Sequence, residues 1–146
     1  MKEAVVFLQK HLGYVFTEPN LCIQALTHRS YGAQHNERLE FLGDAILDFL
    51  ITDIIYRTNP AASEGELSNM RGEQLTKVGE VLQLGDLLLL GVGEENAGGR
   101  QRPSLIANAV EAVIAAVYLD GGLEKCREVV GQLFAPILDS LTPTVG

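Results

Sequence analysis

Apolar residues recur at helical spacing along almost the whole chain, and no segment shows the sustained alternation that marks a strand. Proline suits a first helical turn and glycine commonly ends a helix, so both help to set boundaries. We therefore expect helices over residues 3–12, 18–27, 36–57, 67–84, 103–121 and 123–141, with one further turn at 86–90. Residues 91–102, rich in glycine and charge, are expected to form the only long loop. The pattern predicts an all-α, single-domain helical bundle over residues 1–146.

The helix expected over residues 36–57 carries a stripe of carboxylates. At about 100° per residue, Glu37, Glu40 and Asp44 fall within an arc of roughly 60°. The opposite arc, which we expect to pack into the core, holds Leu39, Leu42, Ile46, Phe49 and Leu50. A solvated acidic face would also explain the stripe, because like charges at this spacing cost a helix only a few tenths of a kcal/mol.

A second polar pair interrupts the apolar helix expected over residues 103–121. Asn108 and Glu111 lie at i and i+3 on one face, while valines and alanines fill the rest. An isolated glutamate in such surroundings carries a large desolvation cost unless something neutralises it, and a cation shared with the acidic helix would do so. Oxygen ligands without cysteine favour Mg²⁺ or Mn²⁺. Spacing alone leaves this metal site and the solvated acidic face both open.

Composition is that of a folded globule, with 47 % hydrophobic and 21 % charged residues. Cys22 and Cys126 form neither a metal-binding nor a disulfide pattern, which is typical of a reducing compartment. We expect no secretory signal at the N-terminus, and no apolar run that approaches the roughly 20 residues of a membrane span. We expect a cytoplasmic protein that does not contact a membrane.

The net charge of −8 is unusual for a protein that binds nucleic acid, because such proteins commonly present a basic surface. Two interpretations remain. The chain has no nucleic-acid partner, or its carboxylates gather at a metal site where bound cations reverse the local charge.

Four segments carry a resemblance to a known family. They are ALTHRS at 25–30, HNERLEFLGDAIL at 35–47, EGELSNMR at 64–71 and NAVEAVIAAVYLDGG at 108–122. In these segments the chain resembles the catalytic domain of the ribonuclease III family. The resemblance implies a helical homodimer that uses Mg²⁺, with Mn²⁺ as a possible substitute, to hydrolyse phosphodiester bonds in double-stranded RNA such as ribosomal RNA precursors. The products would carry a 5′-phosphate and short 3′ overhangs.

The resemblance also implies roles for individual residues. Glu40, Asn108 and Glu111 match metal-ligand positions, and Asp44 and Glu111 match catalytic acidic residues. Glu37 and Glu64 match acidic residues that line the cleft of the family with a less direct role.

Position 108 departs from the family pattern, which usually has Asp where this chain has Asn. An amide oxygen can still coordinate a cation, but one negative charge is lost. We expect weaker Mg²⁺ affinity with activity retained; a catalytically silent protein that binds double-stranded RNA is the alternative. An all-α nucleoside triphosphate pyrophosphohydrolase is a more distant one, and a di-iron bundle lacks its Glu-x-x-His pairs. The double-stranded-RNA-binding domain that usually follows is not in the sequence.

Several single residues attract weaker expectations. Phe41 lies on the polar side of its helix, where it is either an aromatic tucked under a neighbouring helix or a dimer contact. Arg100 and Arg102 precede a helix and either contact RNA phosphates or form a solvated basic pair. For His28 and His35 we expect structural hydrogen bonds.

Overall fold

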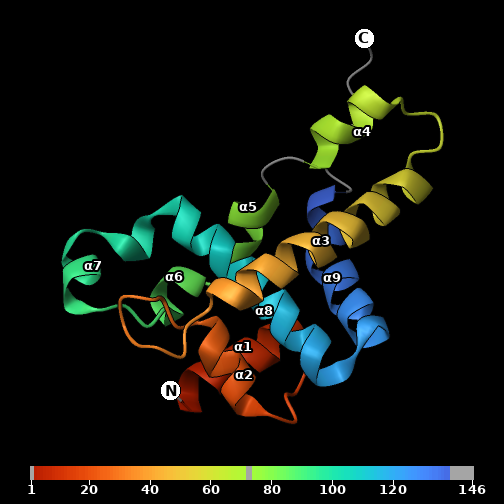
Figure 1. Cartoon of the computed structure of the whole chain (residues 1–146). Helices are drawn as coiled ribbons and strands as arrows, with labels where there is room; N and C mark the ends of the chain where they lie inside the picture. The colour runs from red at the N-terminus through yellow and green to blue at the C-terminus, as the bar shows by residue number, and fades with distance from the viewer. Residues whose placement is uncertain (1, 72–73, 139–146) are drawn as a thin grey trace.

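The computed structural model describes residues 2–71 and 74–138 (Figure 1). Its helices are α1 (Lys2–Leu12), α2 (Pro19–Ala25), α3 (Glu37–Thr58), α4 (Glu64–Arg71), α5 (Gln74–Val81), α6 (Leu84–Leu87), α7 (Val92–Asn96), the 3-10 helix η1 (Gly99–Gln101), α8 (Pro103–Gly121) and α9 (Leu123–Leu138). Among the described residues the only β pairing is an isolated bridge between Thr27 and Leu89. The predicted all-α bundle is confirmed.

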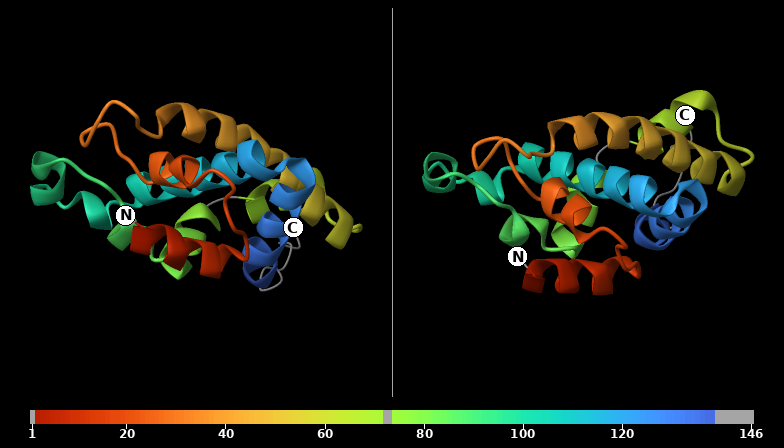
Figure 2. Two further views of the ribbon diagram at one scale, coloured as in Figure 1. Left: turned by 90° about the horizontal axis from the view of Figure 1, so that it is seen from below. Right: turned by 60° about the horizontal axis from the view of Figure 1, so that its bottom comes forward.

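Helix α8 forms the centre of the bundle, because nearly all of its side chains are apolar and most are buried. Figure 2 shows α3 along one side of α8 and α1 on the opposite side of the molecule. The approach of α3 to α8 depends on Gly43, where a Cβ atom would lie 1.7 Å from the backbone oxygen of Glu111. Close contact of the two backbones at this point sets the geometry of the polar residues beside it.

The apolar character of α8 requires one correction. By length and composition this 19-residue helix could cross a membrane, contrary to the expectation that no segment approaches that length. In the structure, however, 61 % of its apolar window is buried inside the protein. The core therefore accounts for its hydrophobicity.

The helix expected over residues 67–84 has different bounds in the structure: α4 begins at Glu64, α5 ends at Val81, and residues 72–73 between them lie outside the described residues. Helix α4 begins earlier, after Ser63: the backbone N–H of Glu66 donates to Ser63 Oγ at 3.2 Å, and the N–H of Ser63 donates to Glu66 Oε1 at 3.3 Å. This reciprocal capping box was readable from the sequence. After α5, Gln83 adopts a left-handed conformation (φ 55°), which α-helices exclude.

The loop expected over residues 91–102 is also wrong, since this segment contains α7 and η1. Arg100 organises it by donating from Nη1 to the backbone oxygens of Gly85 and Leu88, at 3.2 and 2.7 Å. Its Nε lies 2.6 Å from a carboxylate oxygen of Glu95. Contacts with distant residues therefore stabilise this segment, and its own sequence has no helical periodicity that would have predicted α7 and η1.

The other expected helices are confirmed within about two residues at the ends that the structure describes. The expected end of the last helix, Leu141, lies outside the described residues. Phe49, expected in the core, is 54 % exposed. It packs at the edge of α3 beneath the Arg127 guanidinium of α9, 5.9 Å from the ring centre.

Candidate active site

Glu111 is the buried polar residue at the centre of the site, with only 7 % of its surface exposed. It lies on α8 where α3 crosses, beside Asp44 of α3. Burial raises the pKa of Glu111 to about 8, helped by a side-chain hydrogen bond with Asp44 and by the negative charges of Asp44 and Glu40. The raised pKa favours a protonated Glu111 carboxyl that donates to Asp44, which reduces the repulsion between the two groups.

Glu40 joins this cluster from one turn earlier on α3. Partial burial raises its pKa, and the charges of Glu37 and Asp44 raise it further. The predicted stripe of Glu37, Glu40 and Asp44 is thus present, and Glu111 extends it onto a second helix. Repulsion among these carboxylates and the desolvation of two of them make the cluster a strong candidate for a functional site.

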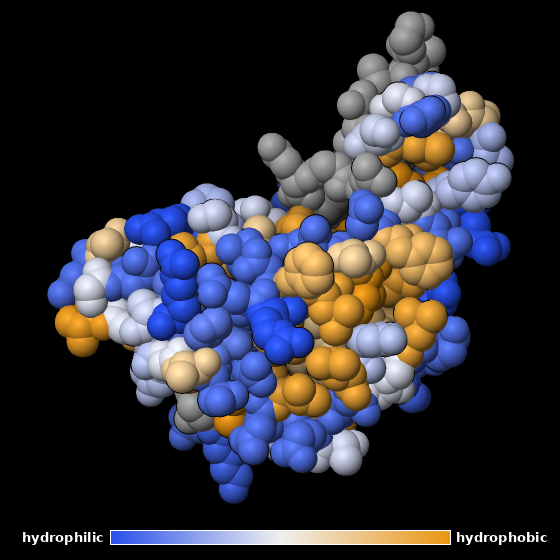
Figure 3. Space-filling view, in the orientation of Figure 1, coloured by the Kyte–Doolittle hydropathy of each residue, from blue (hydrophilic) through white to orange (hydrophobic). Residues whose placement is uncertain are grey.

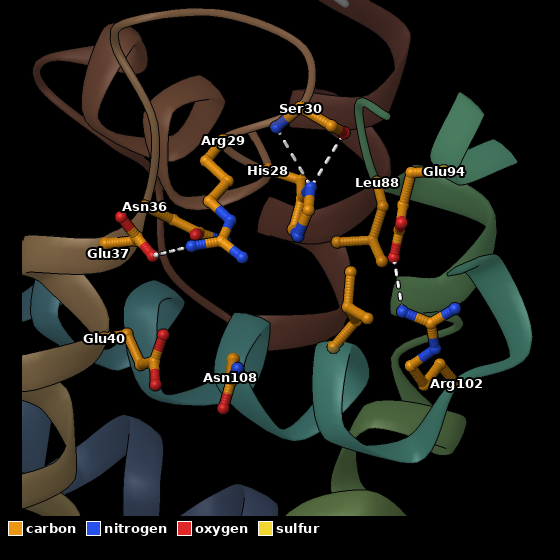
Figure 4. A pocket seen from close by; sticks show the side chains of 11 residues that line it. His28, Arg29, Ser30, Asn36, Glu37, Glu40, Leu88, Glu94, Arg102 and Asn108 are labelled. Atoms are coloured by element: carbon orange, nitrogen blue, oxygen red, sulfur yellow. Dashed lines mark hydrogen bonds and ion pairs between the residues drawn. The ribbon is translucent and has the colours of Figure 1, made fainter. Parts of the chain in front are cut away.

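Asn108 lies one helical turn before Glu111 and lines a pocket of about 460 Å³ with Glu37 and Glu40. Figure 4 shows Glu40 and Asn108 along one wall of this pocket, on α3 and α8. His28 and Arg29 present nitrogen donors across from them, and Arg102 lies with Glu94 at the end of the pocket where α8 begins. The pocket therefore combines oxygen ligands with hydrogen-bond donors and with two arginines that are paired with carboxylates.

The oxygen ligands of the pocket suit a divalent cation. Carboxylate and amide oxygens are the ligands that Mg²⁺ and Mn²⁺ prefer. In the described part of the chain no three Asp, Glu, His or Cys side chains already converge as a metal centre. The raised pKa of Glu111 beside Asp44 and Glu40 shows that this cluster favours a positive charge, which a bound cation would supply. The residues present fit such an ion.

Glu64 lies apart from these residues. It is the first residue of α4, which packs beside the C-terminal end of α3, whereas Glu40 is near the N-terminal end (Figure 1). Glu64 lines a separate hollow with Tyr56 and Leu67. Within one chain the structure does not bring Glu64 into the cleft with the other carboxylates.

Phe41 projects from α3 with 83 % of its surface exposed, so the alternative in which it is tucked under another helix is wrong. Phe49 and Tyr56 on the same helix are exposed as well. Figure 3 shows apolar side chains gathered on the face of the molecule that α3 crosses. Exposed aromatic residues concentrated on one helix are typical of an interaction surface.

The two arginines before α8 differ in their contacts. Arg100 is used by the fold, as described above, and is not a solvated cation. Arg102 lines the pocket, and its Nη1 lies 2.6 Å from Glu94 Oε1. The sequence did not indicate that His28 and Arg29 would face the carboxylates. The ALTHRS motif at residues 25–30 contains both side chains, but the motif alone does not predict that they lie near Asn108.

The fold and the site together define an all-helical domain with a carboxylate cluster beside a polar pocket that also presents hydrogen-bond donors. A family model described as Ribonuclease-III-like matches residues 18–138, and the chain belongs to this family.

Curated relatives agree. Ribonuclease 3 of Nitrosococcus oceani is 51 % identical over 147 residues, which is 97 % of this chain and 63 % of the relative. Ribonuclease 3 of Cupriavidus necator is 46 % identical over 141 residues, which is 93 % of this chain and 55 % of the relative. The chain thus spans less than two thirds of these relatives.

Solved structures agree as well. The nuclease domain of ribonuclease III from Campylobacter jejuni superposes with a TM-score of 0.85 at 37 % identity, covering 93 % of this chain and 97 % of that domain. Dicer from Pichia stipitis superposes with a TM-score of 0.63 at 31 % identity, covering 85 % and 57 %.

Proposed function

We propose that the chain is a metal-dependent endoribonuclease domain that hydrolyses phosphodiester bonds in double-stranded RNA. The observation that carries this proposal is the cluster of Glu40, Asp44 and Glu111, whose member Glu40 lines a pocket together with Asn108. The same pocket presents His28, Arg29 and Arg102. The carboxylates would bind a cation, and the nitrogen donors of the pocket would bind a phosphate group. This combination suits phosphodiester hydrolysis. Membership in the ribonuclease III-like family supports the same activity.

Glu40, Asn108 and Glu111 would hold Mg²⁺, or Mn²⁺ in its place. When bound, the ion supplies an activated water and stabilises charge on the phosphate oxygens. Asp44 would act with Glu111 as the catalytic acidic pair: it accepts the Glu111 hydrogen bond now and would hold or pass a proton during hydrolysis. Glu37 has a positioning role, since its carboxylate lies 3.5 Å from Arg29 Nη1.

A homodimer is part of the proposal, because the described residues of one chain form one such cluster and a duplex has two strands. The exposed Phe41 on α3 would form the dimer contact. A solved structure of the Campylobacter jejuni nuclease domain is described as showing flexibility in a region involved in dimer formation. Two offset sites would leave 5′-phosphates and short 3′ overhangs, and the separation of Glu64 from the cluster within one chain is compatible with a cleft completed by a second copy.

RNA processing in the cytoplasm, for example of ribosomal RNA or messenger precursors, is the proposed setting, without a membrane partner. Recognition would rest on duplex shape, backbone and 2′-hydroxyl groups more than on base sequence. With a net charge of −8, binding should be sensitive to salt.

Asn108 supports a second candidate: a family member that binds double-stranded RNA but cuts it slowly or not at all. Its amide offers an oxygen ligand without a negative charge. The two candidates differ in catalysis, not in fold or partner.

The deciding experiment is cleavage of an end-labelled RNA duplex at low salt with Mg²⁺, Mn²⁺ or EDTA, beside the Asp44→Ala variant. We expect metal-dependent products with short 3′ overhangs that the variant does not form. Duplex that is bound and left intact in both metals would select the silent binding protein. Turnover of deoxynucleoside triphosphates without cleavage or binding of RNA would overturn the proposal in favour of a pyrophosphohydrolase.

A further inference from the structure

The segment that carries His28 is held rigidly against the base of α7. The backbone N–H of His28 donates to the Leu89 oxygen at 3.0 Å, beside the bridge between Thr27 and Leu89. The N–H of Gly91 donates to Ser30 Oγ at 2.9 Å. Gly91 has no room for a side chain, since a Cβ would lie 2.3 Å from the Ser30 backbone oxygen. Backbone contacts on both sides therefore fix the position of residues 28–30.

These contacts also select one tautomer of the His28 ring. The backbone N–H of Ser30 donates to His28 Nδ1 at 3.1 Å, and a backbone nitrogen cannot accept a hydrogen bond. Ser30 Oγ lies 2.8 Å from the same Nδ1 and already accepts from Gly91. Its hydroxyl hydrogen is therefore free to point at Nδ1. With Nδ1 acting as an acceptor, the proton of the neutral ring is on Nε2.

The Nε2–H group of His28 faces the candidate active site. Figure 4 shows the ring descending from Ser30 into the pocket, with its second nitrogen directed toward the side of Asn108. No hydrogen-bond or ion-pair partner of Nε2 is found in the described part of the chain. A donor held in one tautomer and pointing into a cleft is ready to bind an acceptor.

The charged groups around the His28 ring indicate what kind of hydrogen-bond acceptor its Nε2–H would bind. Arg29 and Arg102 line the same pocket, and each is close to a carboxylate: Arg29 Nη1 is 3.5 Å from Glu37 Oε2, and Arg102 Nη1 is 2.6 Å from Glu94 Oε1. These pairs hold the guanidinium groups at the rim but use part of their charge. The His28 ring has no such partner.

We propose that His28 is a substrate-binding residue whose Nε2–H donates to a non-bridging oxygen of the RNA phosphodiester in this pocket, and that Ser30 is its positioning residue. This inference rests on the proposed function and deepens it. Phosphate oxygens accept hydrogen bonds and cannot donate them, which matches the tautomer. A neutral donor also binds phosphate without adding another cation beside the metal site.

The test combines protein variants with single methylphosphonate substitutions, which remove the charge of one phosphate at a time near the cleavage site. Single-turnover cleavage of an end-labelled RNA duplex is followed as a function of enzyme concentration. We expect His28→Ala to weaken half-saturation roughly 10- to 100-fold. His28→Gln, which keeps an N–H donor, should recover part of the loss. Ser30→Ala should have an intermediate effect.

One methylphosphonate position should weaken cleavage by the wild-type protein strongly and cleavage by His28→Ala only slightly, because the same contact is already lost. His11→Ala is the matched control: His11 is exposed on α1, with Nδ1 2.9 Å from the Phe7 oxygen, and should behave as wild type. A ¹⁵N NMR spectrum should show the Nε2–H tautomer for His28 and a shift on addition of duplex. This NMR measurement uses the wild-type protein and so does not depend on how a substitution at residue 28 affects folding.

Wild-type cleavage with a His28→Ala effect below about twofold would overturn the inference and leave the proposed function intact. The same conclusion follows if His28→Ala and every methylphosphonate act additively, or if the ring carries its proton on Nδ1. A wild-type protein that neither binds nor cuts the duplex overturns the proposed function and this inference with it.

Discussion

The Cα of Gly43 on α3 lies so close to Glu111 on α8 that a Cβ atom would be 1.7 Å from the Glu111 backbone oxygen and 2.5 Å from its carbonyl carbon. This contact brings Asp44, the next residue, into hydrogen-bonding reach of the Glu111 carboxyl. Glu111, the most buried acidic residue of the site, therefore contacts Asp44 because Gly43 lets the two helices approach closely.

Replacing Gly43 by alanine should consequently separate α3 from α8. Because the obstructing atoms belong to backbone, they cannot move aside cheaply, and we expect a loss of about 1–3 kcal/mol in the free energy of unfolding. Thermal and urea unfolding would measure it. Gly131→Ala in α9 is the control, since nothing lies within 4 Å of a Cβ there and the helix should gain up to about 1 kcal/mol. Equal stability of the two variants would contradict the argument.

The raised pKa of Glu111 predicts how stability depends on pH without metal. The folded pKa is about 8 and the ordinary value is 4.5, so between these values the folded state binds a proton that the unfolded state has lost. Stability should therefore fall as pH rises through this window and level off above the folded pKa. Glu111→Gln should flatten the decline and exceed the wild type at pH 8 by at least about 1 kcal/mol.

Unfolding curves in EDTA across pH 5–9 would measure this effect. Mg²⁺ should restore wild-type stability at high pH, where Glu111 is ionised, and should do little for Glu111→Gln. A wild-type profile that rises through the window would show that Glu111 is not protonated in the folded protein.

Restoring a carboxylate at position 108 should tighten metal binding. We expect Asn108→Asp to lower the Mg²⁺ concentration for half-maximal duplex cleavage roughly 10-fold, which corresponds to about 1.4 kcal/mol from one additional charge. Asn20→Asp adds the same charge on the exposed start of α2 and should leave the metal requirement unchanged. If Asn108→Asp has no effect on the Mg²⁺ requirement, position 108 does not contribute a ligand.

The exposed aromatic ring of α3 predicts an effect on assembly. Phe41→Ala should shift the protein toward monomer in sedimentation velocity at micromolar concentration. We expect the dissociation constant of the dimer to rise about 10-fold or more, because a buried aromatic anchor commonly dominates an interface. Val15→Ala, at a residue that is 75 % exposed outside the helices, is the control. An unchanged sedimentation coefficient for Phe41→Ala would place the interface elsewhere.

Local features of this protein were determined by the sequence. Helical spacing identified most of the bundle, the acidic stripe of α3 and the pair of Asn108 and Glu111, because residues three or four apart share a helix face whatever the fold. The isolation of Glu111 in an apolar helix already indicated a costly burial, and the structure buries this side chain. The capping box at Ser63 was equally readable, although it was not used to place the helix start at Glu64.

Tertiary structure decided which of these faces meet. The partner of Glu111 depends on the close approach at Gly43, and the direction of the His28 ring depends on Gly91 and Leu89, more than sixty residues away in the chain. The segment expected to be a loop became α7 and η1 through the contacts of Arg100 with distant backbone oxygens. Periodicity reports only the direction in which a side chain leaves its own helix. Distances between helices arise from packing of the whole core. The sequence therefore identified the carboxylates, whereas only the fold showed that His28 and Arg29 lie across the pocket from Glu40 and Asn108.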